Sequence, residues 1–218
     1  MGSNNDISLK ALAKINLGLD VVRRREDGYH EVRMIMQTIH LYDRLDIKRT
    51  KEPGIQIQTN LSFLPVNENN LIYKAAKLLM DEFSITDGVS VKLDKRIPVA
   101  AGMAGGSTDA AAMLIGVNRL FSLGLTKREL MERGVQIGAD VPYCIMRGTA
   151  LAEGIGEALS PLPPMVKCPV LIAKPSISVS TKFVYQNLKL DDTTIHPDID
   201  RLIDDIKAKN LHDIAAHM

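Results

Sequence analysis

The stretch PVAAGMAGGSTDAAAML, residues 98–114, consists largely of glycine and alanine and sets a flexible turn directly against the start of a helix. The alternating segment GVSVKLDKRIP before it predicts a strand, and the apolar segment that follows predicts a buried helix. Small residues at such a junction let backbone N–H groups approach an anion, and the helix N-terminus adds to the attraction. The stretch therefore predicts either a phosphate loop or a tight turn.

Neither of the common phosphate-loop patterns is present, because the stretch contains no G-x-x-x-x-G-K-[ST] and no G-x-G-x-x-G. Ser107 and Thr108 are predicted to cap the helix or to offer hydroxyls to phosphate and metal. Asp109 is predicted to lie in the first turn and to complement the helix dipole, with a metal-linked role as the alternative. At this point anion binding and a simple turn both remain open.

The composition is that of an ordinary globular protein, with 45% hydrophobic and 24% charged residues among 218. The formal net charge of +1 gives no field that favours nucleic acid or a membrane surface. No apolar run could span a membrane, and the first ten residues have no signal-peptide character, so we expect a cytoplasmic protein. Cys144 and Cys168 have no neighbours at ligand spacing and are expected to be buried thiols.

Period-two alternation in the first quarter of the chain predicts long strands. Ile15, Leu17 and Leu19 alternate with polar or small residues, so Lys14 and Asn16 are predicted to project from one face, opposite the core. An Asp-Gly turn at residues 27–28 predicts a hairpin. Strands are expected at residues 11–24, 30–49, 54–60 and 88–98.

Helices are predicted from 3.6-residue periodicity and capping signals. The first should bury the stripe Leu71, Ala75, Leu78, Leu79 and Phe83. The others are expected at residues 109–125, from the capping box of Thr126 and Glu129 to about Gly138, and at residues 198–218. Residues 139–157 are predicted as a loop followed by a strand or hairpin, and residues 168–175 as a short buried strand. Because strands and helices do not alternate regularly, the predicted class is α+β.

Taken singly, the polar candidates are ambiguous. Lys14 is most simply a solvated lysine and Asp140 a turn residue, but paired they could orient and deprotonate a hydroxyl. Tyr29 and His30, next to a turn, and Tyr185 could stack on a base or sugar, or could cover the edge of the core.

Three separated blocks together resemble the GHMP kinases: AKINLGLDVVRRREDGYHEV, PVAAGMAGGSTDAAAML and IGADVPY. Within that family, A-K-I-N-L together with D-G-Y-H-E resembles the branch that acts on a cytidine-diphosphate-linked methylerythritol in isoprenoid precursor synthesis. The resemblance covers essentially the whole chain. It implies an N-terminal GHMP kinase domain of the ribosomal protein S5 domain 2-like fold, followed by a ferredoxin-like domain.

The resemblance also assigns roles. Asp140 would be the base that takes the proton from the substrate hydroxyl, and Lys14 would keep that carboxylate ionised and orient the hydroxyl. Asn16 would bind the methylerythritol part, Tyr29 and Tyr185 would sandwich the cytosine, His30 would bond its edge, and Ile155 would line the same pocket. The loop would wrap ATP phosphates with Pro98, Val99, Ala100, Ala101, Gly102, Met103, Ala104, Gly105, Gly106, Ser107 and Thr108. ATP and Mg²⁺ are the implied cofactors, and the metal ligands are not assigned.

Two departures from the family are expected to matter. Alanines replace glycines in the loop, and if Ala100, Ala101 and Ala104 have ordinary dihedral angles the loop is merely stiffer. The Pro-rich joint LSPLPPM suggests a boundary, with the N-terminal domain over residues 1–160 and the beginning of an incomplete C-terminal domain over residues 161–218.

The expected partner is a small-molecule substrate, without nucleic acid or membrane, and a homodimer is left open.

Two other readings stay open at this point. A shortened, non-catalytic product could still bind nucleotide. An RNA-binding module is allowed by analogy of fold alone, and the balanced charge argues against it.

Overall fold

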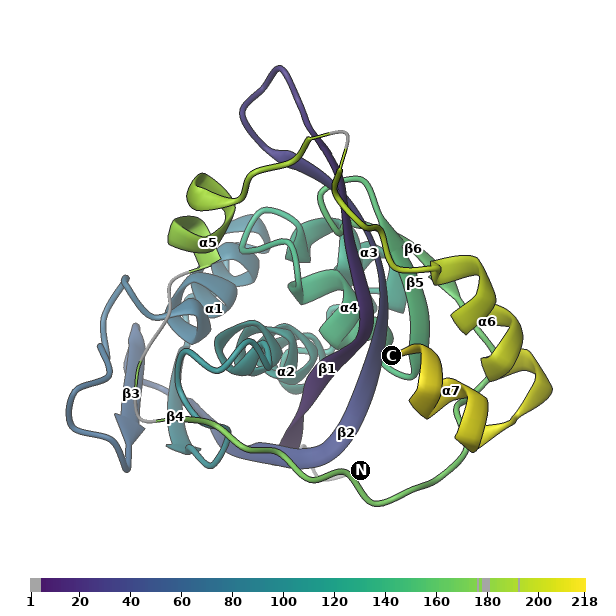
Figure 1. Cartoon of the computed structure of the whole chain (residues 1–218). Coiled ribbons are helices and arrows are strands. Elements are labelled where there is room, and N and C mark those ends of the chain that lie inside the picture. Colours follow the sequence, from purple (N-terminus) through teal and green to yellow (C-terminus); the bar gives the residue numbers. More distant parts are fainter. Residues whose placement is uncertain (1–4, 176, 178–180, 192) are drawn as a thin grey trace. The chain divides into compact units, whose positions relative to one another are not determined.

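The computed structural model describes residues 5–175, 177, 181–191 and 193–218. Two compact units are present. The first comprises the residues up to Ala13, Ile39–Val99 and Ala104–Met146, and the second comprises Lys14–Thr38, Ala100–Met103 and the chain from Arg147 onward. The two long strands predicted from alternation are confirmed, as β1 (Asp6–Arg24) and β2 (His30–Thr50), and each contributes residues to both units (Figure 1).

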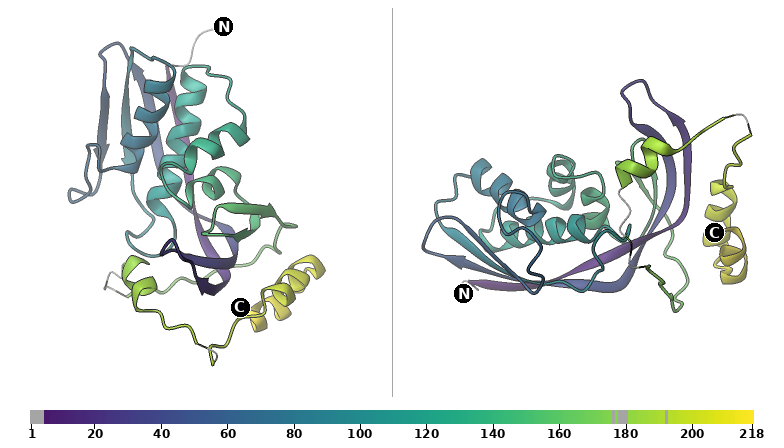
Figure 2. Two further views of the ribbon diagram at one scale, coloured as in Figure 1. Left: turned by 90° about the horizontal axis from the view of Figure 1, so that it is seen from above. Right: turned by 60° about the vertical axis from the view of Figure 1, so that its left-hand side comes forward.

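In the first unit β2 pairs antiparallel with β4 (Gly88–Asp94), and β4 pairs parallel with β3 (Ile55–Thr59). The register sets Ile47 opposite Val91 and Val91 opposite Ile57, so these apolar side chains share one face. Helices α1 (Leu71–Glu82) and α2 (Gly105–Leu120) pack together, and the right-hand view of Figure 2 shows them on one face of these strands. The segregation of strands and helices into layers confirms the predicted α+β class.

Helix α1 buries a different stripe from the predicted one. The buried residues are Ile72, Ala75, Ala76, Leu79 and Met80, while Leu71 and Leu78 are half-buried and Phe83, at the C-cap, is 37% exposed. The apolar positions of this helix outnumber those that one face can hold. The packing against α2, which periodicity does not report, therefore decides which of them are buried.

The capping box of Thr126 and Glu129 is confirmed at the start of α3 (Lys127–Gly134), but the helix ends before the predicted Gly138. A Cβ atom at Gly134 would lie 2.9 Å from Cγ1 of Val141, so the chain turns there to let the next segment pack closely. That segment, predicted as loop, is helix α4 (Val141–Met146), and its first five residues are all buried. Tertiary burial, rather than propensity, accounts for a helix with Pro142 in its first turn.

In the second unit β2 pairs antiparallel with β5 (Thr149–Glu153), which pairs antiparallel with β6 (Ala158–Pro161). The strand predicted within residues 139–157 is β5, and β6, its partner in the hairpin, lies just beyond that range. Three helices follow: α5 (Thr181–Asn187), α6 (Ile199–Ala208) and α7 (Leu211–His217). The helix predicted over residues 198–218 is broken at Lys209, whose backbone is left-handed (φ 56°).

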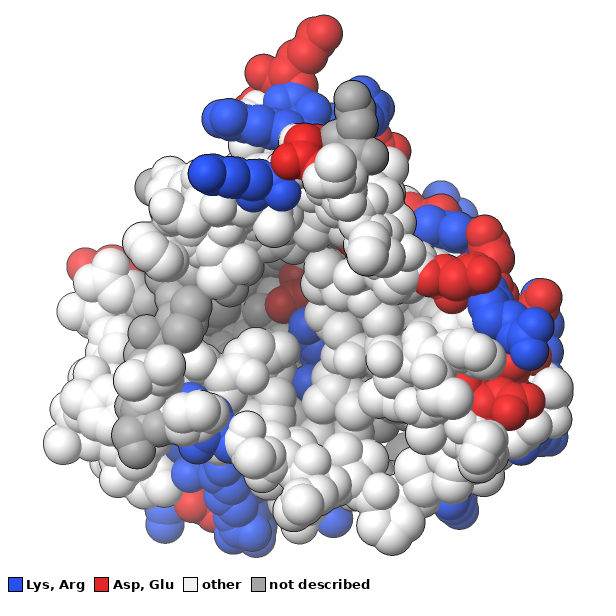
Figure 3. Space-filling model, in the orientation of Figure 1, with Lys and Arg blue, Asp and Glu red and all other residues white. Residues whose placement is uncertain are grey.

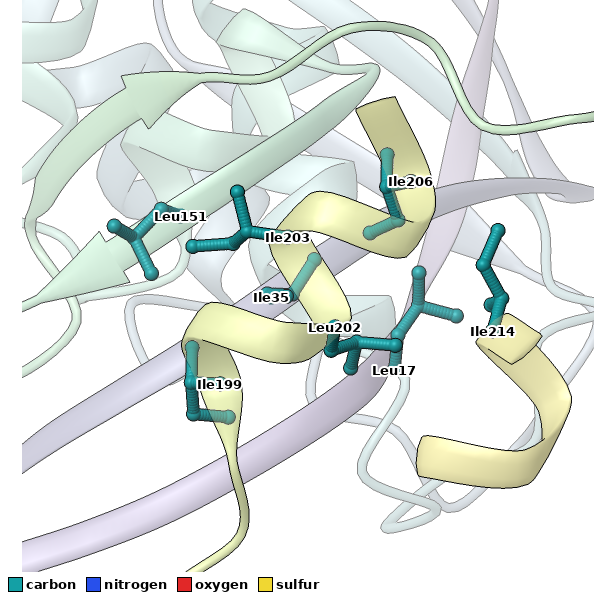
Figure 4. Close-up of a cluster of buried hydrophobic side chains, with 8 residues drawn as sticks. All are labelled: Leu17, Ile35, Leu151, Ile199, Leu202, Ile203, Ile206 and Ile214. Carbon is teal, nitrogen blue, oxygen red and sulfur yellow. The ribbon is translucent and has the colours of Figure 1, made fainter. Parts of the chain in front are cut away.

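The second unit has its own apolar cluster, in which α6 lies against the strands (Figure 4). Leu202 lies beside Leu17 of β1, and Ile203 lies toward Leu151 of β5. A Cβ atom at Gly18 would lie 3.0 Å from Leu202 Cδ2, so the missing side chain allows this close approach. The cluster consists of Leu17, Ile35, Leu151, Ile199, Leu202, Ile203, Ile206 and Ile214.

The outer surface of α6 carries charges of both signs. Asp200, Arg201, Asp204 and Lys207 are exposed, and Figure 3 shows red and blue side chains gathered over this helix. Arg33 of β2 donates to both carboxylate oxygens of Asp200, at 2.8 and 2.6 Å, which fixes the first turn of the helix. Among the described helices, none is both long enough and apolar enough to cross a membrane.

The prediction of a short buried strand at residues 168–175 is wrong. This segment has no regular structure, its Leu171 is 97% exposed, and none of the strand pairs formed by the described residues includes it. A strand needs a neighbour to accept its backbone hydrogen bonds, and an apolar run by itself does not supply one. Cys144 is buried as expected, but Cys168 is only half-buried.

We expect Leu202→Ala to lower the free energy of unfolding by about 2–5 kcal/mol, because it leaves a cavity in the cluster of the second unit. Leu171→Ala is the matched control and should change it by less than about 0.5 kcal/mol, because that side chain is exposed. Urea unfolding followed by circular dichroism measures both. Equal losses in the two variants would contradict the packing described for α6.

Candidate functional site

The Gly/Ala-rich loop has an alternating backbone. Ala100, Gly102 and Ala104 have positive φ angles of 53°, 69° and 54°, and the residues between them do not. Alternation in the sign of φ is a feature of anion-binding nests, in which successive N–H groups turn toward a common point. The condition of ordinary dihedral angles is therefore met by φ at Ala101 but not at Ala100 and Ala104, which adopt the positive φ angles that glycine adopts at no cost.

Helix α2 begins at Gly105 without a side-chain cap. Its N-cap residue is the left-handed Ala104, and within the described chain no side chain caps the helix. The predicted capping role of Thr108 is wrong, since its hydroxyl donates to the carbonyl oxygen of Leu12, at 2.8 Å. The amide groups of the first turn are thus left for water or an anion, in the direction of the helix dipole.

Within the second unit, β1 is hydrogen-bonded to the middle of the loop. The backbone N–H of Lys14 donates to the carbonyl oxygen of Met103, at 3.2 Å. The Lys14 side chain is 5% exposed, and its Nζ donates to Asn16 Oδ1 at 3.1 Å. The prediction that these two residues share a face agrees with this bond, but the expectation that Lys14 projects away from the core is wrong.

Asp140 directly precedes α4 and is half-buried. Its carbonyl oxygen accepts the N–H of Cys144, at 3.0 Å, so the backbone of Asp140 closes the first turn of this helix. The turn position predicted for Asp140 is thus correct. Lys14 and Asp140 belong to different units, and their pairing stays a prediction.

The aromatic candidates lie in the second unit. The rings of His30 and Tyr185 are stacked, with centroids 5.1 Å apart and an interplanar angle of 29°. Tyr29 is 61% exposed, and its backbone N–H donates to the Asp27 carboxylate at the hairpin turn. Ile155 is half-buried in the β5–β6 turn, where its N–H donates to Glu157 at 2.7 Å. The observed partner of Tyr185 is therefore His30, and the predicted sandwich with Tyr29 remains a prediction.

A buried cluster of three charges lies at the base of the loop. Lys95 Nζ donates to the Asp43 carboxylate and to Asp109 Oδ2, the latter at 2.7 Å. The other oxygen of Asp43 accepts the backbone N–H groups of Arg96 and Ile97, at 2.5 and 2.8 Å. All three charged side chains are at most 5% exposed. Sequence reasoning assigned nothing to Lys95 or Asp43; the one available signal was a lysine at the strand end just before the loop.

The prediction that Asp109 complements the helix dipole from the first turn is wrong, because α2 begins four residues before Asp109. Its Oδ1 is buried and, within the residues that the structure describes, has no hydrogen-bond partner. Burial raises the pKa of Asp109 to about 8, and Lys95 only partly offsets this effect. A protonated Asp109 carries no charge that needs compensation, and one ammonium then balances one carboxylate.

Across the described residues there is no group of three or more His, Cys, Asp or Glu side chains that could hold a metal ion. A magnesium ion that accompanies a nucleotide is bound mainly by phosphate oxygens and water, with one or two carboxylates, so it needs no such cage. The alternating loop and the uncapped helix start fit the phosphates themselves.

Comparison with known proteins places this geometry in a family. Residues 70–148 match the model of the GHMP kinases N terminal domain. The 4-diphosphocytidyl-2-C-methyl-D-erythritol kinase of Lachnoclostridium phytofermentans is 61% identical over 210 residues, which cover 96% of this chain and 72% of the relative. That of Lachnospira eligens is 60% identical over 212 residues, covering 97% and 74%. The chain belongs to the 4-diphosphocytidyl-2-C-methyl-D-erythritol kinase family.

Solved structures agree with this membership. A crystal structure of 4-(cytidine 5'-diphospho)-2C-methyl-D-erythritol kinase is 32% identical, with a TM-score of 0.75, and the match covers 93% of this chain and 72% of that one. Homoserine kinase from Cytophaga hutchinsonii, 15% identical, has a TM-score of 0.68 over the whole of this chain and 72% of its own, and shows the shared fold alone. The predicted resemblance to GHMP kinases is confirmed.

We expect Ala104→Gly to stabilise this kinase-family chain by about 0.5–1 kcal/mol. A left-handed alanine costs about 1–2 kcal/mol, and the greater freedom of glycine in the unfolded chain offsets part of the gain. The matched control is Ala112→Gly, inside α2, which should lose about 1 kcal/mol or more. Thermal unfolding at one pH measures both, and a loss of similar size in the two variants would contradict the left-handed assignment.

The raised pKa of Asp109 makes stability depend on pH. The folded state holds this proton more tightly than the unfolded state, so the contribution of Asp109 to stability falls as pH rises from its ordinary 3.8 to about 8 and then levels off. Asp109→Asn keeps an acceptor for Lys95 and should remove this fall. The variant should exceed the parent chain at pH 8 by more than about 1 kcal/mol, since one pKa unit corresponds to about 1.4 kcal/mol.

Urea titrations at intervals between pH 4 and 9 measure the difference between Asp109→Asn and the parent chain. Asp204→Asn, at an exposed position of α6, is the control, and its difference from the parent should not follow the same curve. A difference for Asp109→Asn that stays constant across the range would show that Asp109 is ionised throughout.

Proposed function

We propose that this chain is an ATP-dependent kinase that phosphorylates the 2-hydroxyl of 4-diphosphocytidyl-2-C-methyl-D-erythritol, in the non-mevalonate route to isoprenoid precursors. The observation that carries the proposal is the alternating loop before an uncapped helix, in a chain 61% identical to a kinase with that name. The non-catalytic alternative is not favoured, because the loop, Lys14 and Asp140 are all present. The RNA-binding alternative has no structural observation in its favour.

The phosphoryl donor is ATP, as in other GHMP kinases. We infer that residues 98–108 bind its phosphates with backbone N–H groups. Phosphoryl transfer requires little covalent work from a protein and much positioning and charge neutralisation, which fixed N–H dipoles provide. Mg²⁺ is proposed as the ion that neutralises the phosphate charge when nucleotide is bound.

We assign the acceptor chemistry to Asp140 and Lys14. Asp140 takes the proton from the 2-hydroxyl as that oxygen attacks the γ-phosphorus, and the leaving group is ADP. The role of Lys14 is to hold the carboxylate in its ionised form, and Asn16 binds the methylerythritol portion. The bond from Lys14 Nζ to Asn16 supports a shared role, since it fixes both side chains in one orientation.

We assign the cytosine ring to the second unit. Tyr29 and Tyr185 enclose the ring, His30 forms a hydrogen bond to its edge, and Ile155 contacts it. The support is the stack of His30 and Tyr185 at 5.1 Å, which brings two of these side chains together, and the 61% exposure of Tyr29. A cytoplasmic location suits the use of ATP and the two cysteine thiols. The homodimer stays a prediction.

The test of the function is ADP release by the purified chain with ATP and Mg²⁺. Release is expected with 4-diphosphocytidyl-2-C-methyl-D-erythritol and not with mevalonate or homoserine, which the fold relatives of lower identity accept as substrates according to their names. Turnover of either of those two in place of the cytidyl compound would refute the pyrimidine-pocket assignment. The absence of ADP release with every acceptor would refute the kinase proposal for this chain.

Asp140→Asn should lower kcat by about 10²–10⁴, because it removes the base while keeping the shape of the side chain. The KM for ATP should stay within about threefold of the parent value, since the residue acts on the acceptor. Asp204→Asn on α6 is the control and should leave both constants unchanged. Comparable losses in kcat and in nucleotide affinity would argue against the base assignment.

A further inference from the structure

The buried Lys95 lies outside the groups assigned above to substrate or nucleotide. It directly follows β4, at the point where the chain leaves the sheet for the loop. Its Nζ donates to Asp109 Oδ2 at 2.7 Å, and Asp109 directly follows the last loop residue, Thr108. This hydrogen bond therefore joins the chain before the loop to the chain after it, so that residues 96–108 form a closed turn.

The strand side of this closure is fixed to the sheet. The carboxylate of Asp43, on β2, accepts Lys95 Nζ and also the N–H groups of Arg96 and Ile97. The backbone of Lys95 is bonded in both directions to the side chain of Asn60, at 2.8 and 3.1 Å. The first residues of the loop segment thus have their direction set by bonds to two neighbouring strand regions of the first unit.

On the helix side, Lys95 also lies close to the first residue of α2. A Cβ atom at Gly105, the first residue of α2, would lie 2.9 Å from Lys95 Nζ, so the ammonium group lies against the backbone where the helix begins. Glycine at this position leaves the space that the ammonium occupies. The start of α2 is therefore positioned by contact with Lys95 as well as by the bond to Asp109.

We propose that Lys95 is a positioning residue for phosphoryl transfer, which holds the two ends of the phosphate loop at a fixed separation by bridging Asp43 and Asp109. The proposal rests on the proposed function and adds a residue to it. An apolar side chain in the same space would stabilise the core as well as this buried ion pair does. It would not set the direction of the loop amides, on which an anion site of fixed dipoles depends.

The test uses Lys95→Met alone and in the double variant K95M/D109N. The single variant removes the counter-charge of Asp43 and the hydrogen-bond partner of the buried Asp109 side chain. The double variant also replaces the carboxyl group of Asp109 with a neutral amide, and in both variants Asp43 keeps its bonds to two backbone N–H groups. Lys92→Met, at an exposed position of the same strand, is the matched control. For each variant, stability, the KM for ATP, the KM for the cytidyl acceptor and kcat are measured.

For the folded double variant we expect the KM for ATP to rise about tenfold or more, with the KM for the acceptor changed less than about twofold, since the displacement affects only the nucleotide phosphates. Amide hydrogen exchange without nucleotide should be about tenfold faster in residues 99–107 and unchanged in β3. A double variant with the parent KM for ATP and the parent exchange rates would overturn the proposal. A double variant that cannot fold would also count against it, since the bridge would then be structural.

The two proposals fail in different ways. If the parent chain releases no ADP with any acceptor, the kinase proposal fails, but the exchange rates of the loop and the affinity for ADP measured by calorimetry still test Lys95. If the parent chain is active and the double variant keeps its ADP affinity and loop exchange, only the role of Lys95 is refuted.

Discussion

One buried ammonium group shared by two carboxylates organises the first unit. Lys95 at the end of β4 meets Asp43 of β2 and Asp109 of α2, and the three side chains are withdrawn from water. Removing charges from water is costly, and the attraction between them repays the cost only where the remaining lone pairs are bonded. Asp43 meets this condition with two backbone donors. Asp109 does not, and its raised pKa is the consequence. Such a cluster specifies one arrangement of strand, loop and helix more than it adds stability.

The loop that this cluster closes has a strained backbone at two alanines within the proposed phosphate-binding segment. Ala100 and Ala104 are in the left-handed region, which glycine would occupy without penalty. Strained backbone persists only where the surroundings determine it, and here α2 is almost fully buried beyond its first turn. Alanine in place of glycine leaves the loop fewer alternative conformations. A site that acts through fixed N–H dipoles gains from this restriction, because its amides need not reorganise when phosphate binds.

The second unit combines a well-packed part with a poorly covered one. Helix α6 is held by apolar contacts to β1, β2 and β5 and by the bidentate pair of Arg33 with Asp200. The segment before it exposes Leu171, Ile177 and Ile195 by more than two thirds of their surface. Of the residues that we assign to the acceptor, Lys14, Asn16, Tyr29 and His30 lie on β1, on the hairpin turn and at the start of β2. Tyr185 lies on α5, within the segment before α6.

Local sequence signals and a family resemblance predicted much of this protein. Alternation predicted β1 and β2, the capping box predicted the start of α3, and the three motif blocks predicted the family. Local patterns failed where burial had to choose among equivalent positions. The apolar stripe of α1 is shifted, α4 is a helix and not a loop, and residues 168–175 are exposed and not a strand. In each case burial, which a local pattern does not report, decided the outcome.

By itself the sequence determined the small residues of the loop, the helix that follows it and the family to which the chain belongs, since these depend on the order of neighbouring residues. Only the tertiary structure decided that Lys95, Asp43 and Asp109 meet, that Lys14 is buried beside Asn16, and that two alanines take up left-handed angles. The physical reason is that desolvation and backbone strain are set by atoms brought together from distant segments, and such contacts leave no periodic signal in the sequence.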